Sequence, residues 1–264
     1  MKKIAVVTGA TSGIGKAVAQ VLAAQQFNLI LTGRRKERLD ALKAELGRKY
    51  KCDVLPLCFD IRDREATEQM IASLPAVWKK IDVLVNNAGL SAGLEPLHEG
   101  NPDDWNQMID TNIKGLLHIS RVVSALMVER RSGHIVHISS IAGRDVYPRG
   151  NVYCATKAAV DALTLGMRMD LLPHGVKVSS IAPGMVETEF SLVRFKGNQE
   201  RAARVYEHMT PLSAADVADA LWYVVSRPAH VCVQDMLLMP SAQANATQVH
   251  RMPSPESPMN DSSK

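Results

Sequence analysis

The amino-acid sequence predicts an α/β fold of the Rossmann type: a doubly wound, seven-stranded parallel sheet with helices on both faces, in a single domain. Two observations support this prediction. Short apolar runs alternate with segments of helical periodicity along most of the 264 residues, which is typical of parallel strands joined by helical crossovers. In addition, a glycine-rich stretch, TGATSGIG (residues 8–15), directly follows the first apolar run and precedes the first helical pattern.

Each predicted strand is a short run of aliphatic and β-branched residues, as expected for strands that are buried on both faces. The runs cover residues 4–8, 28–32, 54–59, 82–85, 134–138, 176–182 and 231–239. Apolar residues three and four positions apart predict the helices between them. The first helix begins at about Ile14, and further helices cover residues 103–130, about 151–172 and 214–225. Two more helices lie between the second and fourth strands, the first marked by Leu39, Leu42 and Leu46 and the other containing Met70, Ile71 and Leu74. Gly115 is expected to kink the helix over residues 103–130.

Composition and charge argue against several classes of protein. The 31 Lys and Arg residues are scattered among 27 Asp and Glu residues, giving a net charge of +4, so we expect no nucleic-acid partner. The four cysteines form no C-x-x-C pair and no metal-type spacing, which predicts reduced thiols in a cytoplasmic protein without a metal site. No stretch approaches the ~18 apolar residues of a membrane span, so we expect no membrane partner.

The glycine-rich stretch predicts a dinucleotide site. Gly9, Gly13 and Gly15 allow a tight turn and a close backbone approach, and the N-terminus of the following helix can receive a pyrophosphate. The alternative is a purely structural turn. Where NAD-binding chains carry an acid for the ribose 2′-hydroxyl, this chain has Arg34 and Arg35. Two guanidinium groups favour a 2′-phosphate, and therefore NADP(H), although a solvated basic helix start is the alternative.

Tyr153 and Lys157 are four residues apart in a predicted helix, so their side chains share one face. An ammonium group close to a phenol favours the phenolate, and we expect it to lower the pKa of Tyr153. Such a tyrosine could exchange the proton that an alcohol/carbonyl interconversion requires. The same spacing is common on helix surfaces, so the pair needs support from the rest of the chain.

Several motifs taken together resemble the short-chain dehydrogenase/reductase family. They are TGATSGIG at residues 8–15, NNAG at residues 86–89, Asn112, Ser140 thirteen residues before Tyr153, the Tyr153-x-x-x-Lys157 pair, and Pro183-Gly184. The resemblance covers roughly residues 3–240. It implies a Rossmann-type fold, a nicotinamide dinucleotide cofactor, oxidoreductase activity on a CH–OH group, and a homodimer or homotetramer.

The resemblance implies a role for each matching residue. Tyr153 would donate or accept the proton, Lys157 would lower its pKa and bind the nicotinamide ribose, and Ser140 would hold the substrate oxygen. Asn112 would anchor a water molecule of the proton relay, or it could instead bridge a helix kink. The implied cofactor-binding residues are Gly9, Thr11, Ser12, Gly13, Ile14, Gly15, Arg34, Arg35, Asp60, Ile61, Asn87, Ala88, Gly89, Tyr153, Lys157, Pro183, Gly184, Val186 and Thr188.

Further stretches, including DDWNQMIDTNIKGL and GMVETEFSLVRFKG, resemble one subgroup. Its members are NADP-dependent 3-hydroxy acid dehydrogenases, acting on serine, allo-threonine or 3-hydroxypropionate/malonic semialdehyde. A small anionic substrate calls for a guanidinium group, which can pair with its anion bidentately. The predicted substrate-binding residues are Ser140, Tyr153, Tyr147, Arg144, Arg149 and Arg194. Each of the three arginines could equally be a plain surface charge.

Two alternatives stay open. Arg144 and Arg149 add charge where smaller residues are expected in the serine-type enzymes, which leaves room for a related sulfoacetaldehyde reductase that forms isethionate. A dinucleotide-binding regulator without catalysis is a remote second alternative. We expect residues 1–240 to form the catalytic domain, with a substrate loop at about 184–212 and a C-terminal arm at 241–251. The Pro- and Ser-rich residues 252–264 predict a disordered tail.

Overall fold

The computed structural model describes residues 2–252. Seven strands form one parallel sheet in the order β3-β2-β1-β4-β5-β6-β7. Their bounds are β1 Ile4–Val7, β2 Asn28–Gly33, β3 Val54–Cys58, β4 Ile81–Asn86, β5 Gly133–Ile138, β6 Val176–Pro183 and β7 Asp235–Leu238. The predicted fold class is confirmed. The chain runs outward from β1 to β3 on one side and from β4 to β7 on the other, so the strand order reverses between β1 and β4. Open α/β sheets bind ligands at this switch point.

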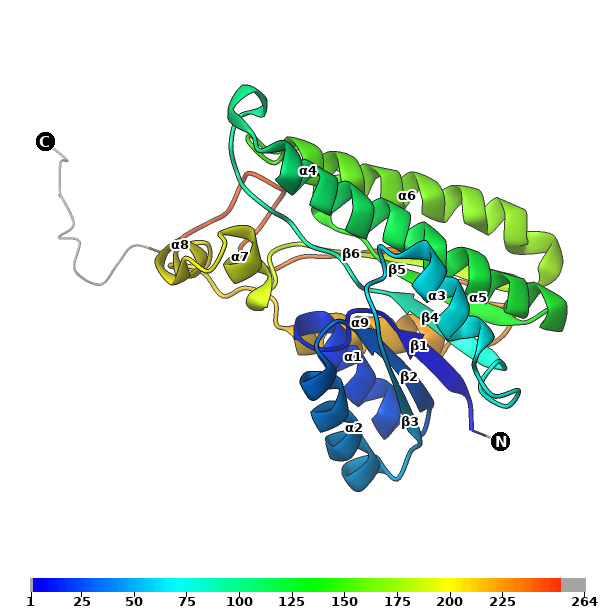
Figure 1. Cartoon of the computed structure of the whole chain (residues 1–264). Helices are drawn as coiled ribbons and strands as arrows, with labels where there is room; N and C mark the ends of the chain where they lie inside the picture. The colour runs from blue at the N-terminus through cyan, green and yellow to red at the C-terminus, as the bar shows by residue number, and fades with distance from the viewer. Residues whose placement is uncertain (1, 253–264) are drawn as a thin grey trace, which may run out of the picture.

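Helices cover both faces of the sheet (Figure 1). The α-helices are α1 Gly13–Ala24, α2 Lys36–Tyr50, α3 Arg64–Ala72, α4 Pro102–Ile109, α5 Leu116–Arg130, α6 Asn151–Leu171, α7 Glu189–Arg194, α8 Gln199–Arg204 and α9 Ala214–Val225. Short 3₁₀ turns occupy Leu97–Glu99, Ile141–Gly143 and Leu172–His174. Helices α1, α2 and α9 cover one face, whereas α3, α5 and α6 cover the other.

The apolar spacing read from the sequence accounts for this layering. In α2, Leu39, Leu42 and Leu46 lie three and four residues apart, and all three are buried against the sheet. In α5, Ile119 and Val123 are completely buried against the opposite face. Each helix therefore presents one apolar stripe to a sheet whose two faces are both apolar, which is the arrangement expected for parallel strands.

The predicted helix over residues 103–130 is divided by a π-helical segment, Asp110–Gly115, between α4 and α5. The kink expected at Gly115 takes the form of this segment, which ends at that glycine. A Cβ on Gly115 would lie 2.8 Å from Ile61 Cγ2, so only a glycine permits this close approach. Single π-helical turns are frequent at functional sites, and Asn112 lies within this one.

The segment over residues 184–212, expected to be a loop, contains α7 and α8, which lie outside the two helical layers (Figure 1). Both helices are capped by side chains, because Thr188 Oγ1 accepts from Phe190 N at 3.2 Å and Asn198 Oδ1 accepts from Arg201 N at 2.9 Å. Strand β7 is shorter than the run at 231–239 suggested. None of the described helices is long and apolar enough to span a bilayer.

Residues 241–252 pack against this substrate end of the molecule. Gln243 Oε1 accepts a hydrogen bond from Met185 N at 2.8 Å, and the Asp145 carboxylate accepts one from Ala246 N at 2.8 Å. The division into a domain, an arm and a tail stays a prediction. The predicted tail at 252–264 lies, apart from Met252, outside the described residues.

Candidate active site

A cavity of about 350 Å³ opens at the carboxyl ends of the central strands. Of the predicted cofactor-binding residues, all except Gly15 line it. These residues come from the turn after β1, the ends of β2 and β4, helix α6, and the segment after β6. The fold thus brings together residues that lie far apart in the sequence.

The glycine-rich turn lies against the end of β4. Gly9 has a φ of +65°, and a Cβ there would lie 3.0 Å from Ala88 Cα. Gly15 is excluded from the cavity wall because it packs inward: a Cβ there would lie 2.4 Å from Gly9 O and 2.5 Å from Asn87 Nδ2. Asn87 Nδ2 in turn donates to Thr8 O at 2.9 Å. These glycines therefore let the backbone fold tightly at the start of α1.

The N-terminus of α1 points its first amide groups towards the cavity. Ser12 is the N-cap residue, but its side chain makes no capping hydrogen bond, and the first turn contains no acidic residue. The amide hydrogens of this turn are thus available to an anion, and the helix dipole favours one there.

Arg34 and Arg35 lie at the end of β2, on the wall of the cavity. Arg35 donates from Nε and Nη2 to Thr11 Oγ1 at 3.1 and 2.7 Å, from Nη2 to Ser12 Oγ at 2.8 Å, and from Nη1 to Glu189 at 3.0 Å. Arg34 is less constrained, since its ion pair with Asp60 is 3.8 Å long. Both arginines therefore line the cavity, and Arg35 is held beside the glycine-rich turn.

Asp60, predicted to lie at the adenine, is held by its neighbour Arg62, whose Nη2 donates to Asp60 Oδ2 at 2.6 Å. Burial would raise the pKa of this carboxyl group, but the hydrogen bonds from Arg62 and the charges of Arg62 and Arg34 outweigh it and lower that pKa. Asp60 is therefore ionised at neutral pH and fixed at the cavity edge.

Asn112 joins three elements through its amide group. Its Oδ1 accepts from Leu90 N at 2.9 Å, and its Nδ2 donates to Leu90 O at 2.8 Å and to Thr156 Oγ1 at 3.0 Å. Asn112 is only 1% exposed and does not line the cavity. Its side chain therefore fixes the β4 loop and α6 to the π-helical segment, which matches the bridging alternative.

Tyr153 and Lys157 lie on one face of α6, as predicted, and both line the cavity. Lys157 Nζ donates to Ile138 O at 2.9 Å and lies 6.0 Å from the centre of the Tyr153 ring. Burial lowers the pKa of Lys157 to about 8, against the raising effect of Asp161. The ammonium group therefore contacts a backbone carbonyl at the end of β5.

The expected lowering of the pKa of Tyr153 is wrong for this structure. Burial raises the pKa of the Tyr153 phenol, and the Arg194 charge and a hydrogen bond with Ser140 offset only part of that rise. Ser140 Oγ also accepts from Ala142 N at 3.1 Å. The neighbouring Ser139 lines the large cavity, whereas Ser140 is the serine that lowers the pKa of the Tyr153 phenol. A neutral phenol is the form that can donate a proton.

None of the three candidate substrate arginines lines the large cavity, but Arg194 packs against its residue Tyr153. Arg194 Nε donates to Ser91 Oγ at 2.9 Å and its Nη2 to Tyr147 OH at 2.6 Å. The guanidinium carbon lies 5.2 Å from the centre of the Tyr153 ring and 5.3 Å from that of Phe190. The structure therefore places one partly buried cation directly over the predicted proton donor.

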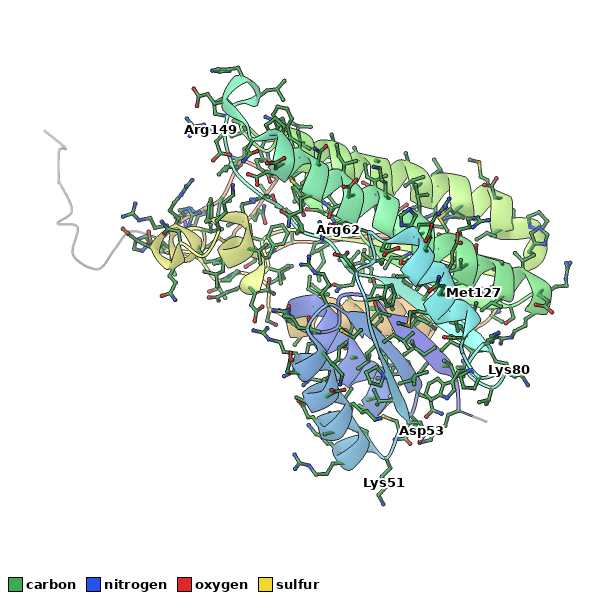
Figure 2. All side chains as sticks on the ribbon, viewed as in Figure 1. Lys51, Asp53, Arg62, Lys80, Met127 and Arg149 are labelled. Atoms are coloured by element: carbon green, nitrogen blue, oxygen red, sulfur yellow. The ribbon has the colours of Figure 1, made fainter. Side chains whose placement is uncertain are left out.

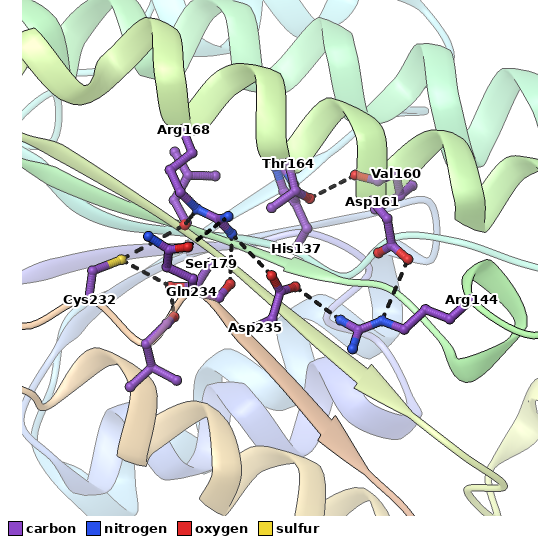
Figure 3. Close-up of polar contacts among 12 residues, drawn as sticks. His137, Arg144, Val160, Asp161, Thr164, Arg168, Ser179, Cys232, Gln234 and Asp235 are labelled. Carbon is purple, nitrogen blue, oxygen red and sulfur yellow. Dashed lines mark hydrogen bonds and ion pairs between the residues drawn. The ribbon is translucent and has the colours of Figure 1, made fainter. Parts of the chain in front are cut away.

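Arg144 does not line the cavity, contrary to its predicted place at the substrate, and pairs with two carboxylates instead (Figure 3). Its Nη2 donates to Asp235 in β7 at 3.0 Å, and its Nε lies 3.8 Å from the Asp161 carboxylate in α6. Arg168 reaches the same Asp235 at 3.7 Å. Arg144 thus belongs to an ion-pair network that joins α6 to β7, because it pairs with Asp161 in α6 and with Asp235 in β7.

Arg149 is also absent from the large cavity. Arg149, labelled in Figure 2, is exposed and has a φ of +66°. It borders a second cavity of only about 20 Å³. A space of that size holds one water molecule and no organic anion. Tyr153 lines the same small space, so Arg149 lies near the predicted proton donor but leaves no room there for a substrate anion.

Some residues of the site were not anticipated from the sequence. Phe190 packs on Tyr153 in a tilted arrangement with ring centres 5.6 Å apart, and Glu189 and Val193 line the cavity. All three belong to α7, which has too few residues to show a clear helical period. Within the described residues, no cluster of three or more His, Cys, Asp or Glu side chains could hold a metal ion.

Comparison with known proteins agrees with this geometry. The family model described as "short chain dehydrogenase" matches residues 3–199. The "NADP-dependent 3-hydroxy acid dehydrogenase YdfG" of Salmonella typhi is 50% identical over 250 residues, covering 94% of this chain and 99% of its own length. The "Serine 3-dehydrogenase" of Rhizobium radiobacter is 45% identical over 246 residues, covering 93% of this chain and 97% of its own.

Solved structures give the same picture. A structure described as the closed form of serine dehydrogenase complexed with NADP+ is similar with a TM-score of 0.89 and 47% identity. The match covers 94% of this chain and 100% of that one. Serine dehydrogenase from Escherichia coli follows with a TM-score of 0.80 and 43% identity, covering 91% of this chain and 99% of the other.

Proposed function

The chain belongs to the short-chain dehydrogenase/reductase family, and on this premise we propose that it is an NADP(H)-dependent oxidoreductase of short 3-hydroxy acids. It would interconvert serine, allo-threonine or 3-hydroxypropionate with the corresponding carbonyl compound. The observation that carries this proposal is the position of the Arg194 guanidinium group, 5.2 Å from the centre of the Tyr153 ring.

The residues at the carboxyl ends of the strands fit NADP(H). The turn around Gly9 and the unblocked N-terminus of α1 suit a pyrophosphate, and Arg34 and Arg35 suit a 2′-phosphate. Lys157 Nζ, at the end of β5, would bind the nicotinamide ribose. When bound, the cofactor supplies the carbon that gives or takes the hydride. NADP-named relatives and an NADP-bound neighbour support this assignment.

Tyr153 would carry out the proton transfer. In carbonyl reduction its neutral phenol would donate a proton to the carbonyl oxygen, while Ser140 would hold that oxygen by a hydrogen bond. In alcohol oxidation the same proton would return to Tyr153. The positive charges of Lys157 and Arg194 would stabilise the phenolate that forms between these steps. Asn112 would hold α6 and the loop after β4 in position through its side-chain hydrogen bonds.

Arg194 would bind the substrate's carboxylate. In a 3-hydroxy acid the anion lies two or three bonds from the reacting carbon, so a cation that lies over the Tyr153 ring is at a suitable distance. Tyr147 and Ser91 hold the guanidinium group at 2.6 and 2.9 Å and would leave part of its fork for a bidentate contact. This arrangement favours a short anionic substrate over a neutral alcohol.

The sulfoacetaldehyde alternative is not favoured by the structure's arginines. It depended on Arg144, which pairs with Asp235, and on Arg149, which is exposed beside a space too small for an organic anion. A panel assay decides between the substrates. Purified protein with NADPH is mixed with malonic semialdehyde and sulfoacetaldehyde, and with NADP+ it is mixed with serine and isethionate. We expect turnover of the carboxylates. Preference for the sulfonates would overturn the substrate assignment, and absence of any turnover would favour the non-catalytic regulator.

Replacing Arg194 by Met should raise the KM for serine by about two orders of magnitude, because a charge-assisted bidentate contact is lost. The KM for a neutral short alcohol should change little. Initial-rate kinetics of both substrates check this prediction. Arg144→Ala and Arg149→Ala are the matched controls and should leave the KM for serine within about threefold. A larger increase of the KM for serine in either control would contradict the assignment of the anion site to Arg194.

Replacing Arg34 and Arg35 together by Ala should raise the KM for NADPH by roughly 100-fold, because both guanidinium groups near the predicted 2′-phosphate are lost. The KM for NADH, which lacks that phosphate, should change much less. The control is Arg48→Ala in the last turn of α2, the helix that follows Arg35; Arg48 does not line the cavity. Equal increases for both cofactors would refute the 2′-phosphate assignment.

A homodimer or homotetramer in the cytoplasm stays part of the proposal. Leu165, Met169 and Leu172 are exposed by 53%, 62% and 74% along α6 and the turn that follows it. They form an apolar stripe that a second copy could cover, which supports association through this helix.

A further inference from the structure

The short helix α7 connects the two predicted binding regions. It begins at Glu189 and ends at Arg194, and Phe190 and Val193 between them line the cavity. An α-helix rises 1.5 Å per residue, so the two terminal side chains leave it roughly 8 Å apart along its axis. One end of α7 therefore reaches the nucleotide half of the site, and the other end carries the proposed anion-binding residue.

Glu189 fixes the first end of α7 to the start of α2. Its carboxylate accepts from Arg35 Nη1 at 3.0 Å, and from Arg38 Nη1 at 2.8 and 3.1 Å. Partial burial would raise the pKa of Glu189, but the hydrogen bonds and charges of Arg38 and Arg35 outweigh it and lower that pKa. Over residues 2–252, these are the only ion pairs between α7 and the helices of the nucleotide half.

The second end of α7 is fixed to the opposite wall. Gly93 N donates to Arg194 O at 3.1 Å, and Lys196 Nζ forms an ion pair with Asp104 of α4 at 2.9 Å. The helix thus crosses the cavity with a polar attachment on each side. Loss of the attachment at Glu189 would leave α7 without an ion pair to α2 or to Arg35, while Ser191 would still contact Tyr206 OH at 2.8 Å.

We propose that Glu189 is a positioning residue for the substrate. Its ion pairs with Arg35 and Arg38 hold α7 closed over the cavity and keep Arg194 over Tyr153. Arg35 belongs to the predicted 2′-phosphate region, so Glu189 links that region to the substrate anion through a single helix. The role of Arg194 in this proposal depends on the proposed function, whereas the attachment of α7 does not.

The proposal predicts different effects on the KM for serine and on the KM for NADP+. If α7 is closed in only a fraction of molecules, the apparent affinity for serine falls by that fraction. Glu189→Gln should therefore raise the KM for serine by about three- to tenfold, the range expected for a small exposed ion-pair network. The KM for NADP+ should stay the same or fall, since Arg35 loses an anionic neighbour. The kcat should stay within about twofold, because Glu189 does not touch the reacting atoms.

A double-mutant cycle separates this role from a general loss of stability. Arg38 pairs with Glu189 and does not line the cavity. Arg38→Gln alone should raise the KM for serine, but in the Glu189→Gln background it should cause no further rise. Glu187→Gln is the matched control, since Glu187 is exposed nearby and forms no ion pair among the described residues. Additive effects of Glu189→Gln and Arg38→Gln would overturn the proposal.

Amide hydrogen exchange tests the attachment without any turnover. The α7 amides should exchange severalfold faster in Glu189→Gln and Arg38→Gln than in the wild type, with Glu187→Gln unchanged. Unchanged exchange in α7 would refute the attachment. If the wild type turned over no hydroxy acid, the proposed function would fail, while the exchange experiment would still decide whether Glu189 holds α7.

Discussion

Tyr153→Phe is expected to reduce kcat for serine oxidation and for carbonyl reduction by about 10³-fold or more, within the range lost when a general acid or base is removed. Among the described residues of the site, the Tyr153 phenol is the only hydroxyl group on α6 that lies near both Lys157 and Arg194. NADPH should still bind with nearly unchanged affinity, because Phe keeps the ring that packs on Phe190. Steady-state kinetics and the quenching of NADPH fluorescence measure the two effects separately.

The matched control for this variant is Tyr147→Phe. Tyr147 lies in the same site, but its hydroxyl group contacts Arg194 at 2.6 Å, so its loss should raise the KM for the anionic substrate with little change in kcat. Retained turnover in Tyr153→Phe, or a larger loss of kcat in Tyr147→Phe, would remove Tyr153 from its assigned role.

Lys157→Met should lower kcat/KM for NADPH by about 10²-fold, since the ammonium group proposed to bind the ribose and stabilise the phenolate is lost. The same change should stabilise the cofactor-free protein. Burial lowers the pKa of Lys157 from 10.5 to about 8, which corresponds to roughly 3 kcal/mol of unfavourable free energy at neutral pH. The lost hydrogen bond to Ile138 O offsets about 1 kcal/mol of the gain.

The stability gained by Lys157→Met should decrease as pH rises. Between pH 8 and pH 10.5, Lys157 is protonated in the unfolded chain and largely neutral in the folded one. The unfolded state then binds more protons, so the stability of the wild type rises with pH in this window, and the advantage of Lys157→Met shrinks. Urea denaturation of both proteins at pH 7 and near pH 10 measures this difference. A constant difference would mean that the buried amine is not the cause.

The value of kcat/KM for NADPH should also depend on the ionisation of Lys157. Values of kcat/KM for NADPH report the free enzyme, so in the wild type they should fall as pH rises through about 8 and Lys157 loses its proton. In Lys157→Met this alkaline limb should be absent. A limb that persists in the variant would assign it to another group.

Elements whose signals are local were predictable from the sequence. The helix over residues 214–225 has the predicted bounds in the structure, because its start is marked by a Ser213–Asp216 capping box and its apolar residues follow one stripe. The Gly9–Gly15 turn was predictable for a similar reason, since backbone freedom is a property of glycine itself. Helix α7 was not, because six residues give too short a pattern.

The sequence by itself determined the parallel sheet, the nucleotide turn, and the shared face of Tyr153 and Lys157, all of which follow from spacing along one segment. Only the tertiary structure decided which arginine reaches the site. Arg194 donates a hydrogen bond to Ser91, 103 residues away in the sequence, while Arg144 donates one to Asp235, 91 residues away. The tertiary structure also decided the sign of the pKa shift of Tyr153. Desolvation is the collective effect of every group that packs around the phenol, and no local spacing encodes it.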